Sequence, residues 1–291
     1  MTLSLVVLAA GLGSRYGGLK QVDPVGPSGE TVLDYAVFDA WRAGFSRVVF
    51  VIRRDFDALF REKIGARYAG RLTVDYVHQS LETLPAECHP AAVRQKPWGT
   101  GHALWCARAV LPANFAVINA DDFYGTDSFM RLARFLESAR GPEFAMVGFQ
   151  LAHTLSEHGV VSRGLTTFFP DGTLRSLVEQ HGITAGEVGQ GRRFAATEIV
   201  SMNCWGFTPA LLEGLEARLR EFLRTHGGDP KAEFYLPVAV SDLIARGEAR
   251  VHVLPTEGEW FGVTYREDRP CVERAIAALV HAGQYPARLW S

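Results

Sequence analysis

Short apolar runs alternate with helical apolar patterns through the first half of the chain. The runs are rich in Val, Leu and Ile, which is typical of strands buried on both faces of a parallel sheet. The pattern predicts strands over 3–8, 47–52, 72–77 and 114–119, separated by helices over 31–43, 56–65 and 101–110. This alternation predicts an α/β fold, with a doubly wound, mostly parallel (mixed) central sheet and helices on both faces.

The second half of the chain has a less regular pattern. It predicts strands over 144–150, 173–178, 199–207 and 251–254, and helices over 209–225 and 269–282. Residues 182–193 are rich in glycine, which indicates a hairpin or a loop. Because no internal repeat or low-complexity linker interrupts the pattern, we expect a single domain over residues 1–291.

Composition narrows the classes of function. The 291 residues are 47% hydrophobic, which is enough for a large core, and the formal net charge is -2. We therefore expect no nucleic-acid partner, and an anionic ligand would need a local positive site. The four cysteines are widely spaced and form no C-x-x-C pair, which argues against a zinc ribbon or a disulfide framework.

The apolar stretch at residues 3–10 is too short to span a membrane and lacks the basic start of a signal peptide. No run of about 20 apolar residues occurs elsewhere. We therefore expect a cytoplasmic protein with no membrane partner. The late helix could support a homo-oligomer.

A glycine-rich loop follows the first predicted strand and reads A-A-G-L-G-S-R-Y-G-G-L-K-Q over residues 9–21. Glycines let a backbone approach phosphate and turn its N–H groups inward. Arg15 and Lys20 add two positive charges, and Arg can grip phosphate oxygens bidentately. The loop is neither a Walker A motif nor G-x-G-x-x-G, because Tyr16 stands at the third glycine position. The loop therefore predicts a phosphate site.

Two carboxylates, Asp121 and Asp122, follow the apolar strand 114–119. Carboxylates at the carboxyl end of a strand are well placed to hold Mg²⁺, which takes a few protein oxygens together with substrate phosphates. We predict that Asp121 binds this ion. Asp122 is either a second ligand or a turn former.

The glycine-rich loop resembles the signature loop of the nucleotidyltransferases that make nucleotide sugars and related activated alcohols. The match is L-A-A-G-x-G-S-R followed by a lysine. The resemblance implies a Rossmann-like nucleotidyltransferase fold, with Lys20 neutralising the transferring phosphate. It implies nucleotide contacts at Leu8, Ala9, Ala10, Gly11, Gly13, Ser14 and Arg15.

The stretch Q-K-P-W-G-T-G-H-A at residues 95–103 resembles the second nucleotide segment of this family. There a glutamine reads the base edge, and a glycine turn lets the base lie against the backbone. The resemblance implies base contacts at Gln95, Gly99 and Thr100. The spacing from glutamine to glycine is one residue shorter than in the thymidylyltransferases, so the choice of base stays open.

Several later positions resemble the family's sugar-phosphate site. Glu179 matches the first residue of its Glu-Lys pair, but Gln180 replaces the lysine, and Lys231 is the candidate for the missing charge. Asn203 and Glu233 match residues near the sugar. Gly262 stands where the family has a second metal-binding aspartate. Either another residue supplies that carboxylate, or one metal ion and the triphosphate suffice.

The resemblance implies transfer of a nucleoside monophosphate from a nucleoside triphosphate to a sugar 1-phosphate, with Arg15, Lys20 and Asp121 as catalytic residues and Mg²⁺ as cofactor. The attacking phosphate is already an anion, so no general base is required. We expect a nucleotide-binding half over 1–130, a sugar-phosphate half over 131–268 and a terminal helix over 269–291. Two alternatives stay open: a cytidylyltransferase acting on a phosphorylated alcohol such as phosphocholine or an isoprenoid precursor, and a nucleotide-sugar-binding regulatory protein without catalysis.

Overall fold

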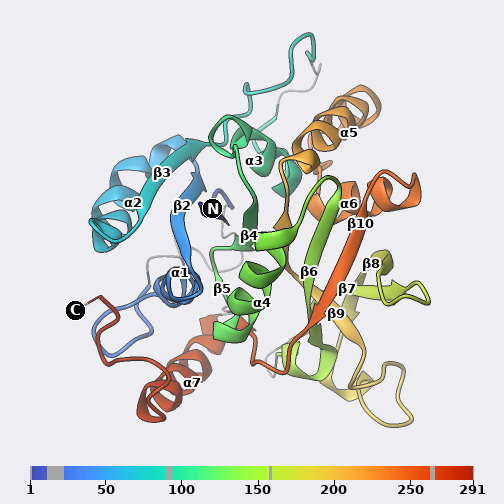
Figure 1. Ribbon diagram of the computed structural model, residues 1–291. Helices are drawn as coiled ribbons and strands as arrows, with labels where there is room; N and C mark the ends of the chain where they lie inside the picture. Colours follow the sequence, from blue (N-terminus) through green and yellow to red (C-terminus); the bar gives the residue numbers. More distant parts are fainter. Residues whose placement is uncertain (1, 12–22, 90–93, 157–158, 263–265, 291) are drawn as a thin grey trace.

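The computed structural model describes residues 2–11, 23–89, 94–156, 159–262 and 266–290 (Figure 1). Within them lies a nine-stranded sheet, whose main path runs β10-β6-β9-β4-β1-β2-β3. Its nucleotide-side strands are β1 (Leu3–Leu8), β2 (Phe45–Ile52), β3 (Thr73–His78) and β4 (Phe115–Asn119). These four strands are parallel, so their carboxyl ends meet at one edge of the sheet, as the sequence predicts.

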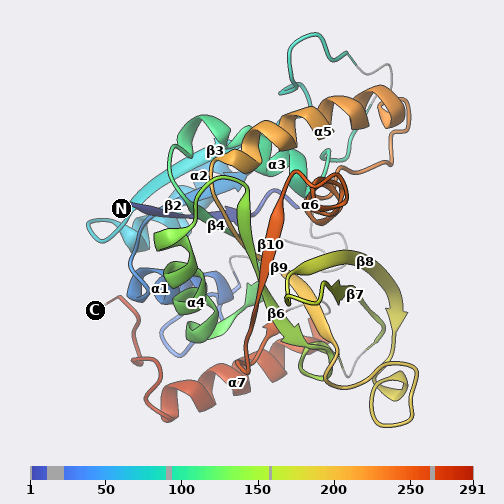
Figure 2. The same ribbon diagram turned by 45° about the vertical axis from the view of Figure 1, so that its right-hand side comes forward.

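Helices cover both faces of the sheet (Figure 1, Figure 2). Both faces must be covered because successive side chains of β1 point to opposite faces and all are apolar. Leu5 and Val7 belong to one buried cluster, whereas Val6 and Leu8 belong to another. The first cluster is closed by α1 (Val32–Arg42), α2 (Asp57–Lys63) and α4 (Gly125–Ser138). The second is closed by α3 (Thr100–Cys106), α5 (Ala210–His226) and α6 (Leu236–Ala245).

The second half adds antiparallel pairs to the sheet. Strand β9 (Ile199–Phe207) lies antiparallel between β4 and β6 (Glu143–Gln150), and β10 (Arg250–Pro255) runs parallel to β6. A hairpin of β7 (Val161–Phe168) and β8 (Leu174–Ile183) pairs with β9 through β7. The predicted mixed sheet is therefore confirmed. The structure adds α4, α6 and β7, which the sequence analysis does not predict.

A short two-stranded sheet joins β5 (Asp122–Phe123) to β11 (Phe261–Gly262). Below it, α7 (Arg269–His281) and the following segment pack on the outer face of α1 in a third buried cluster. The Tyr285 hydroxyl donates a 2.6 Å hydrogen bond to the buried Asp39 carboxylate of α1. These contacts fix the strand that carries Gly262 beside the end of β4. No helix in the described part of the chain is long and apolar enough to cross a membrane.

Candidate active site

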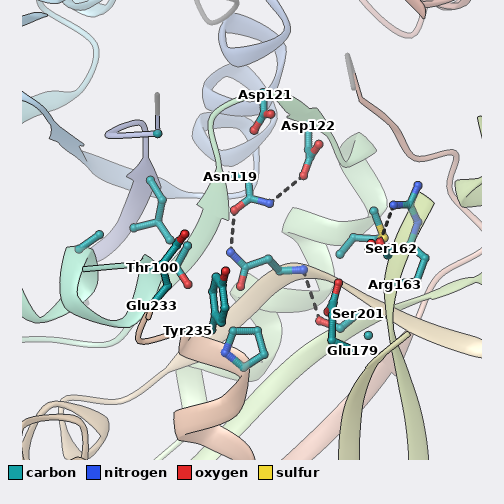
Figure 3. Close-up of a pocket in the computed structure, with 18 of the residues that line it drawn as sticks. Thr100, Asn119, Asp121, Asp122, Ser162, Arg163, Glu179, Ser201, Glu233 and Tyr235 are labelled. Carbon is teal, nitrogen blue, oxygen red and sulfur yellow. Dashed lines mark hydrogen bonds between the residues drawn. The ribbon is translucent and has the colours of Figure 1, made fainter. Parts of the chain in front are cut away.

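A cleft of about 630 Å³ opens at the carboxyl edge of the sheet. Figure 3 shows its walls: Thr100, Glu233 and Tyr235 on one side, Ser162 and Arg163 on the other, and Asp121 and Asp122 at one end. Ligands of open α/β sheets bind at this edge. The lining residues come from both halves of the chain.

The end of β1 forms the first wall of the cleft. Leu8, Ala10 and Gly11 line it, whereas Ala9 is buried and its N–H donates to Val51 O at 2.8 Å. This is the alternation expected of a chain leaving a strand, in which every second residue faces inward. The remaining predicted loop residues, Gly13, Ser14, Arg15 and Lys20, lie outside the described residues.

Hydrogen bonds hold a polar cluster at the end of β4. Asn119 Nδ2 donates to Asp122 Oδ2 at 2.9 Å, and the Tyr124 hydroxyl lies 3.1 Å from the same oxygen. Asn203 Nδ2 donates to Asn119 Oδ1 at 2.6 Å, which links β9 to β4 (Figure 3). Asp122 is 8% exposed, and Asp121, beside it, is half-buried and also lines the cleft. Both predicted metal ligands therefore reach the cleft.

Asn203 has a left-handed backbone with φ 60°. Asparagine adopts this conformation more readily than most residues. Its side-chain oxygen accepts a hydrogen bond from Trp205 Nε1 at 2.9 Å, while its nitrogen is bonded to Asn119. Asn203 thus lines the cleft in a fixed orientation, as a residue that binds a hydroxyl would need to be.

The carboxylate of Asp122 occupies the space beside Gly262 where a side chain would lie. The two residues face each other across the β5–β11 pair, and a Cβ built on Gly262 would lie 2.6 Å from Asp122 Oδ1. No side chain fits at 262 unless that carboxylate moves, because real Cβ contacts are essentially never under 3.0 Å. The chain thus lacks the aspartate that the family has at this position, but the carboxylate of Asp122 lies in the space that such a side chain would occupy.

The nucleotide side of the cleft differs from the expectation in one residue. Gly99 and Thr100 line the cleft, whereas Gln95 is exposed and is not among the lining residues. Gly99 has φ 103°, and a Cβ there would lie 2.6 Å from Phe234 O, so only glycine fits. The glutamine that lines the cleft is Gln79, directly after β3. The sequence feature that could have pointed to Gln79 is a polar residue shortly after a predicted strand.

The acceptor side is built by β7, β8 and the segment before α6. Glu179 of β8 and Glu233 line the cleft, as predicted, but Lys231 is exposed and is not among the lining residues. Arg163 of β7, which the sequence analysis does not single out, does line it. In the β7–β8 register Arg163 lies opposite Gln180, where the family has lysine. Arg163 and Lys96 are the only cations among the described lining residues.

Arg163 is held in place on several sides. It is 7% exposed, its Nε donates to Thr154 Oγ1 at 3.0 Å, and its guanidinium lies 4.9 Å from the centre of the Trp260 ring. Burial lowers the pKa of Arg163 to about 10, and the nearby carboxylates of Asp122 and Glu179 oppose the shift. Arg163 therefore stays a cation at neutral pH. Burial also raises the pKa of Glu179, against the charges of His181 and Arg163.

A protein-family model described as Nucleotidyl transferase matches residues 4–222. The chain belongs to the nucleotidyl transferase family. The crystal structure of UDP-glucose pyrophosphorylase complexed with UDP-glucose has the same fold, with a TM-score of 0.63 and 18% sequence identity over 96% of this chain and 99% of that one. No curated protein sequence matches the chain. The matched residues include the glycine-rich loop, the segment at 95–103 and Asp121, but not Lys231, Glu233 or Gly262.

Proposed function

We propose that this nucleotidyl transferase moves a nucleoside monophosphate from a nucleoside triphosphate to a sugar 1-phosphate, which yields a nucleoside diphosphate sugar and pyrophosphate. The observation that carries the proposal is the cleft, where the end of β1 at Gly11 and two carboxylates that follow β4 lie near a second polar wall. A shared fold with UDP-glucose pyrophosphorylase supports a sugar phosphate as the acceptor. We retain the predicted halves, 1–130 for the nucleotide and 131–268 for the acceptor, within one domain.

The chemistry requires alignment and charge neutralisation. A phosphate oxygen of the acceptor attacks the α-phosphorus, and the bond to the β-phosphate breaks so that pyrophosphate leaves. Because the attacking oxygen is already anionic, no residue has to remove a proton. We assign the charges facing the triphosphate to Arg15 and Lys20, from residue type and position in the loop. The backbone contacts remain those expected from the sequence: Leu8, Ala9, Ala10, Gly11, Gly13, Ser14, Gly99 and Thr100.

The residues at the end of β4 fit a magnesium ion shared with substrate phosphates. In the described part of the chain no group of three His, Cys, Asp or Glu side chains could hold a metal, so a cage made by protein alone is not indicated there. Mg²⁺ commonly takes one or two carboxylates plus phosphate oxygens, and Asp121 and Asp122 supply that number. Bound there, the ion would offset negative charge on the triphosphate. Asn119 and Tyr124 hold the Asp122 carboxylate in position.

On the acceptor side, we assign the sugar hydroxyls to Glu179, Asn203 and Glu233, and the acceptor phosphate to Arg163 in place of Lys231. A dianionic phosphate next to two carboxylates needs a cation, and Arg163 is the one that lines this wall. Because Nε and Nη2 of Arg163 already donate to Thr154 and Nη1 donates to Ser162 O, Arg163 would attract the phosphate mainly through its fixed positive charge. The loss of lysine at Gln180 therefore does not by itself indicate degraded catalysis, and neither does Gly262, whose space holds Asp122.

Pyrophosphate release tests the proposal. The purified chain is incubated with Mg²⁺ and each of the common ribonucleoside and deoxyribonucleoside triphosphates, against sugar 1-phosphates, phosphocholine and an isoprenoid phosphate precursor. We expect release only with a sugar 1-phosphate present. Release that depends on an alcohol phosphate instead would support the cytidylyltransferase alternative. Release with no acceptor at all, or binding without release, would reject the transfer reaction.

A further inference from the structure

Gln79 lines the cleft at the end of β3, away from the carboxylates of Asp121 and Asp122 that follow β4. In the sheet order β4-β1-β2-β3, three strand intervals separate Asn119 at the end of β4 from Gln79 after β3, which is about 14 Å at the usual strand spacing. The end of β1, where Leu8, Ala10 and Gly11 line the cleft, lies between them. A triphosphate that extends from the carboxylates past the end of β1 would therefore direct its base toward β3, where Gln79, Gly99 and Ala103 line the cleft.

Two hydrogen bonds fix the orientation of the Gln79 amide. Gln79 Nε2 lies 3.0 Å from Gly99 O and 3.0 Å from His102 Nδ1. The opposite ring nitrogen, His102 Nε2, lies 2.6 Å from Thr83 O. A backbone carbonyl can only accept, so His102 carries its proton on Nε2, and its Nδ1 is an acceptor. Both partners of the amide group are then acceptors, and only its nitrogen can face them.

His102 keeps this arrangement at every pH at which the enzyme would work. The ring is fully buried on α3, and burial lowers the pKa of His102 to about 4, a shift that the Thr83 hydrogen bond opposes and that Arg94 and Arg108 reinforce. The ring is therefore neutral and its tautomer is fixed. The amide oxygen, Gln79 Oε1, receives no hydrogen bond from the described residues and is not among their buried unpartnered atoms. It is thus accessible in the cleft.

We propose that His102 sets the base preference of the enzyme, by holding Gln79 with its nitrogen turned inward and its carbonyl oxygen offered to the base, so that the cleft takes uracil or thymine over cytosine. The inference rests on the proposed function, which places a nucleotide in this cleft. Uracil and thymine carry a proton on ring nitrogen N3, which a carbonyl oxygen accepts. Cytosine has a lone pair at N3, which faces the same oxygen with repulsion and leaves it unpaired.

The test compares UTP with CTP, which share ribose and triphosphate and differ only at N3 and the 4-position. Binding of each to the full chain is measured by calorimetry with Mg²⁺ and no acceptor, and kcat/KM is measured with a sugar 1-phosphate. Wild type is expected to prefer UTP by about 10- to 100-fold, since a polar group left unpaired in a partly enclosed site costs affinity of that order. Equal binding, or a preference for CTP, overturns the inference.

Variants separate the positioning role of His102 from its packing. His102→Leu removes the acceptor at Nδ1 and frees the amide, so the UTP:CTP ratio should fall to within about threefold of unity. His102→Asn places a side-chain oxygen near the Nδ1 position and should restore most of the ratio. Leu104→Ala, which creates a cavity beneath the same helix, should lower stability and leave the UTP:CTP ratio unchanged. A ratio that survives His102→Leu, or that falls equally in Leu104→Ala, contradicts the role.

Gln79→Met keeps the test decisive if the His102 variants fail to fold. Gln79 is half-buried at the cleft, so methionine of similar length should be tolerated, and it should abolish the preference as His102→Leu does. A Met variant that keeps the preference overturns the inference. The binding ratio does not depend on turnover. An enzyme that turns over CTP best refutes the base preference alone, whereas a chain that binds UTP selectively but releases no pyrophosphate refutes the proposed function alone.

Discussion

Replacing Gly262 with alanine should disable the proposed metal-binding end of the cleft by displacing Asp122. The added Cβ would lie 2.6 Å from Asp122 Oδ1 and 3.0 Å from the Trp260 ring. The carboxylate is the smaller obstacle, but it can turn away only by disturbing the contacts of Oδ2 with Asn119 Nδ2 and the Tyr124 hydroxyl. Hydrogen bonds to charged groups contribute about 1.5–3 kcal/mol each, and partial re-solvation offsets some of that loss. We expect Gly262→Ala to lower the free energy of unfolding by about 1–3 kcal/mol.

The effect of this substitution on turnover should exceed its effect on folding. A displaced Asp122 no longer shares the ion with Asp121, so kcat should fall at least tenfold, equivalent to ~1.4 kcal/mol of barrier. The Mg²⁺ concentration for half-maximal rate should rise. Pyrophosphate release at varied Mg²⁺ measures both, and urea unfolding measures stability. Gly186→Ala is the control, because a Cβ there has nothing within 4 Å. A Gly262→Ala enzyme with wild-type kcat and Mg²⁺ dependence would refute the reasoning.

Three further predictions concern charged residues that the sequence analysis or the proposed function assigns to the substrates. Asp121→Ala should remove metal-dependent turnover while unfolding stays cooperative; turnover within about twofold of wild type, well short of the tenfold that ~1.4 kcal/mol represents, would count against its role. Arg15→Ala and Lys20→Ala should each lower kcat by about 10² to 10³, with little change in the KM of the triphosphate or in Tm, because preorganised donors act mainly on the transition state; unchanged kcat in both would reject the phosphate-loop assignment. Arg163→Met should raise the KM of the sugar phosphate more than that of the triphosphate in steady-state kinetics, whereas Lys231→Ala should change neither, and the reverse pattern would restore Lys231 to the acceptor site.

The first half of the fold is readable in the sequence because its strands are mostly apolar runs, or in β3 an alternating one, separated by helical patterns. The second half is less so. Helix α4 begins after Tyr124 with no side-chain cap. Helix α6 has no capping bond at Tyr235 either, and Pro237 in its first turn is its one start signal. Strand β7 contains Gly164 and two half-exposed or exposed threonines. Its pairing with β8 and β9, rather than its own pattern, makes it a strand.

The residues of the site also divide into those marked by their local sequence and those placed by long-range pairing. Asp121, Asp122 and Gly99 are marked by local context, namely a strand end or a glycine turn, and they line the cleft as expected. The glutamine that we propose faces the base is different, because it is Gln79 rather than Gln95 that lines the cleft, and the sheet order brings it there. Arg163 is likewise placed by the register of a hairpin. Such residues are set by pairing distant in sequence, which local patterns do not encode.

The central claim is that the acceptor's own phosphate oxygen attacks the α-phosphorus. It is tested most directly with a sugar 1-phosphate labelled with ¹⁸O at all its phosphate oxygens, incubated with unlabelled triphosphate, Mg²⁺ and the enzyme. Mass spectrometry should find every ¹⁸O atom in the nucleoside diphosphate sugar, formed in equal amount with unlabelled pyrophosphate. Labelled inorganic phosphate or labelled pyrophosphate, or no nucleoside diphosphate sugar while triphosphate is consumed, would contradict it.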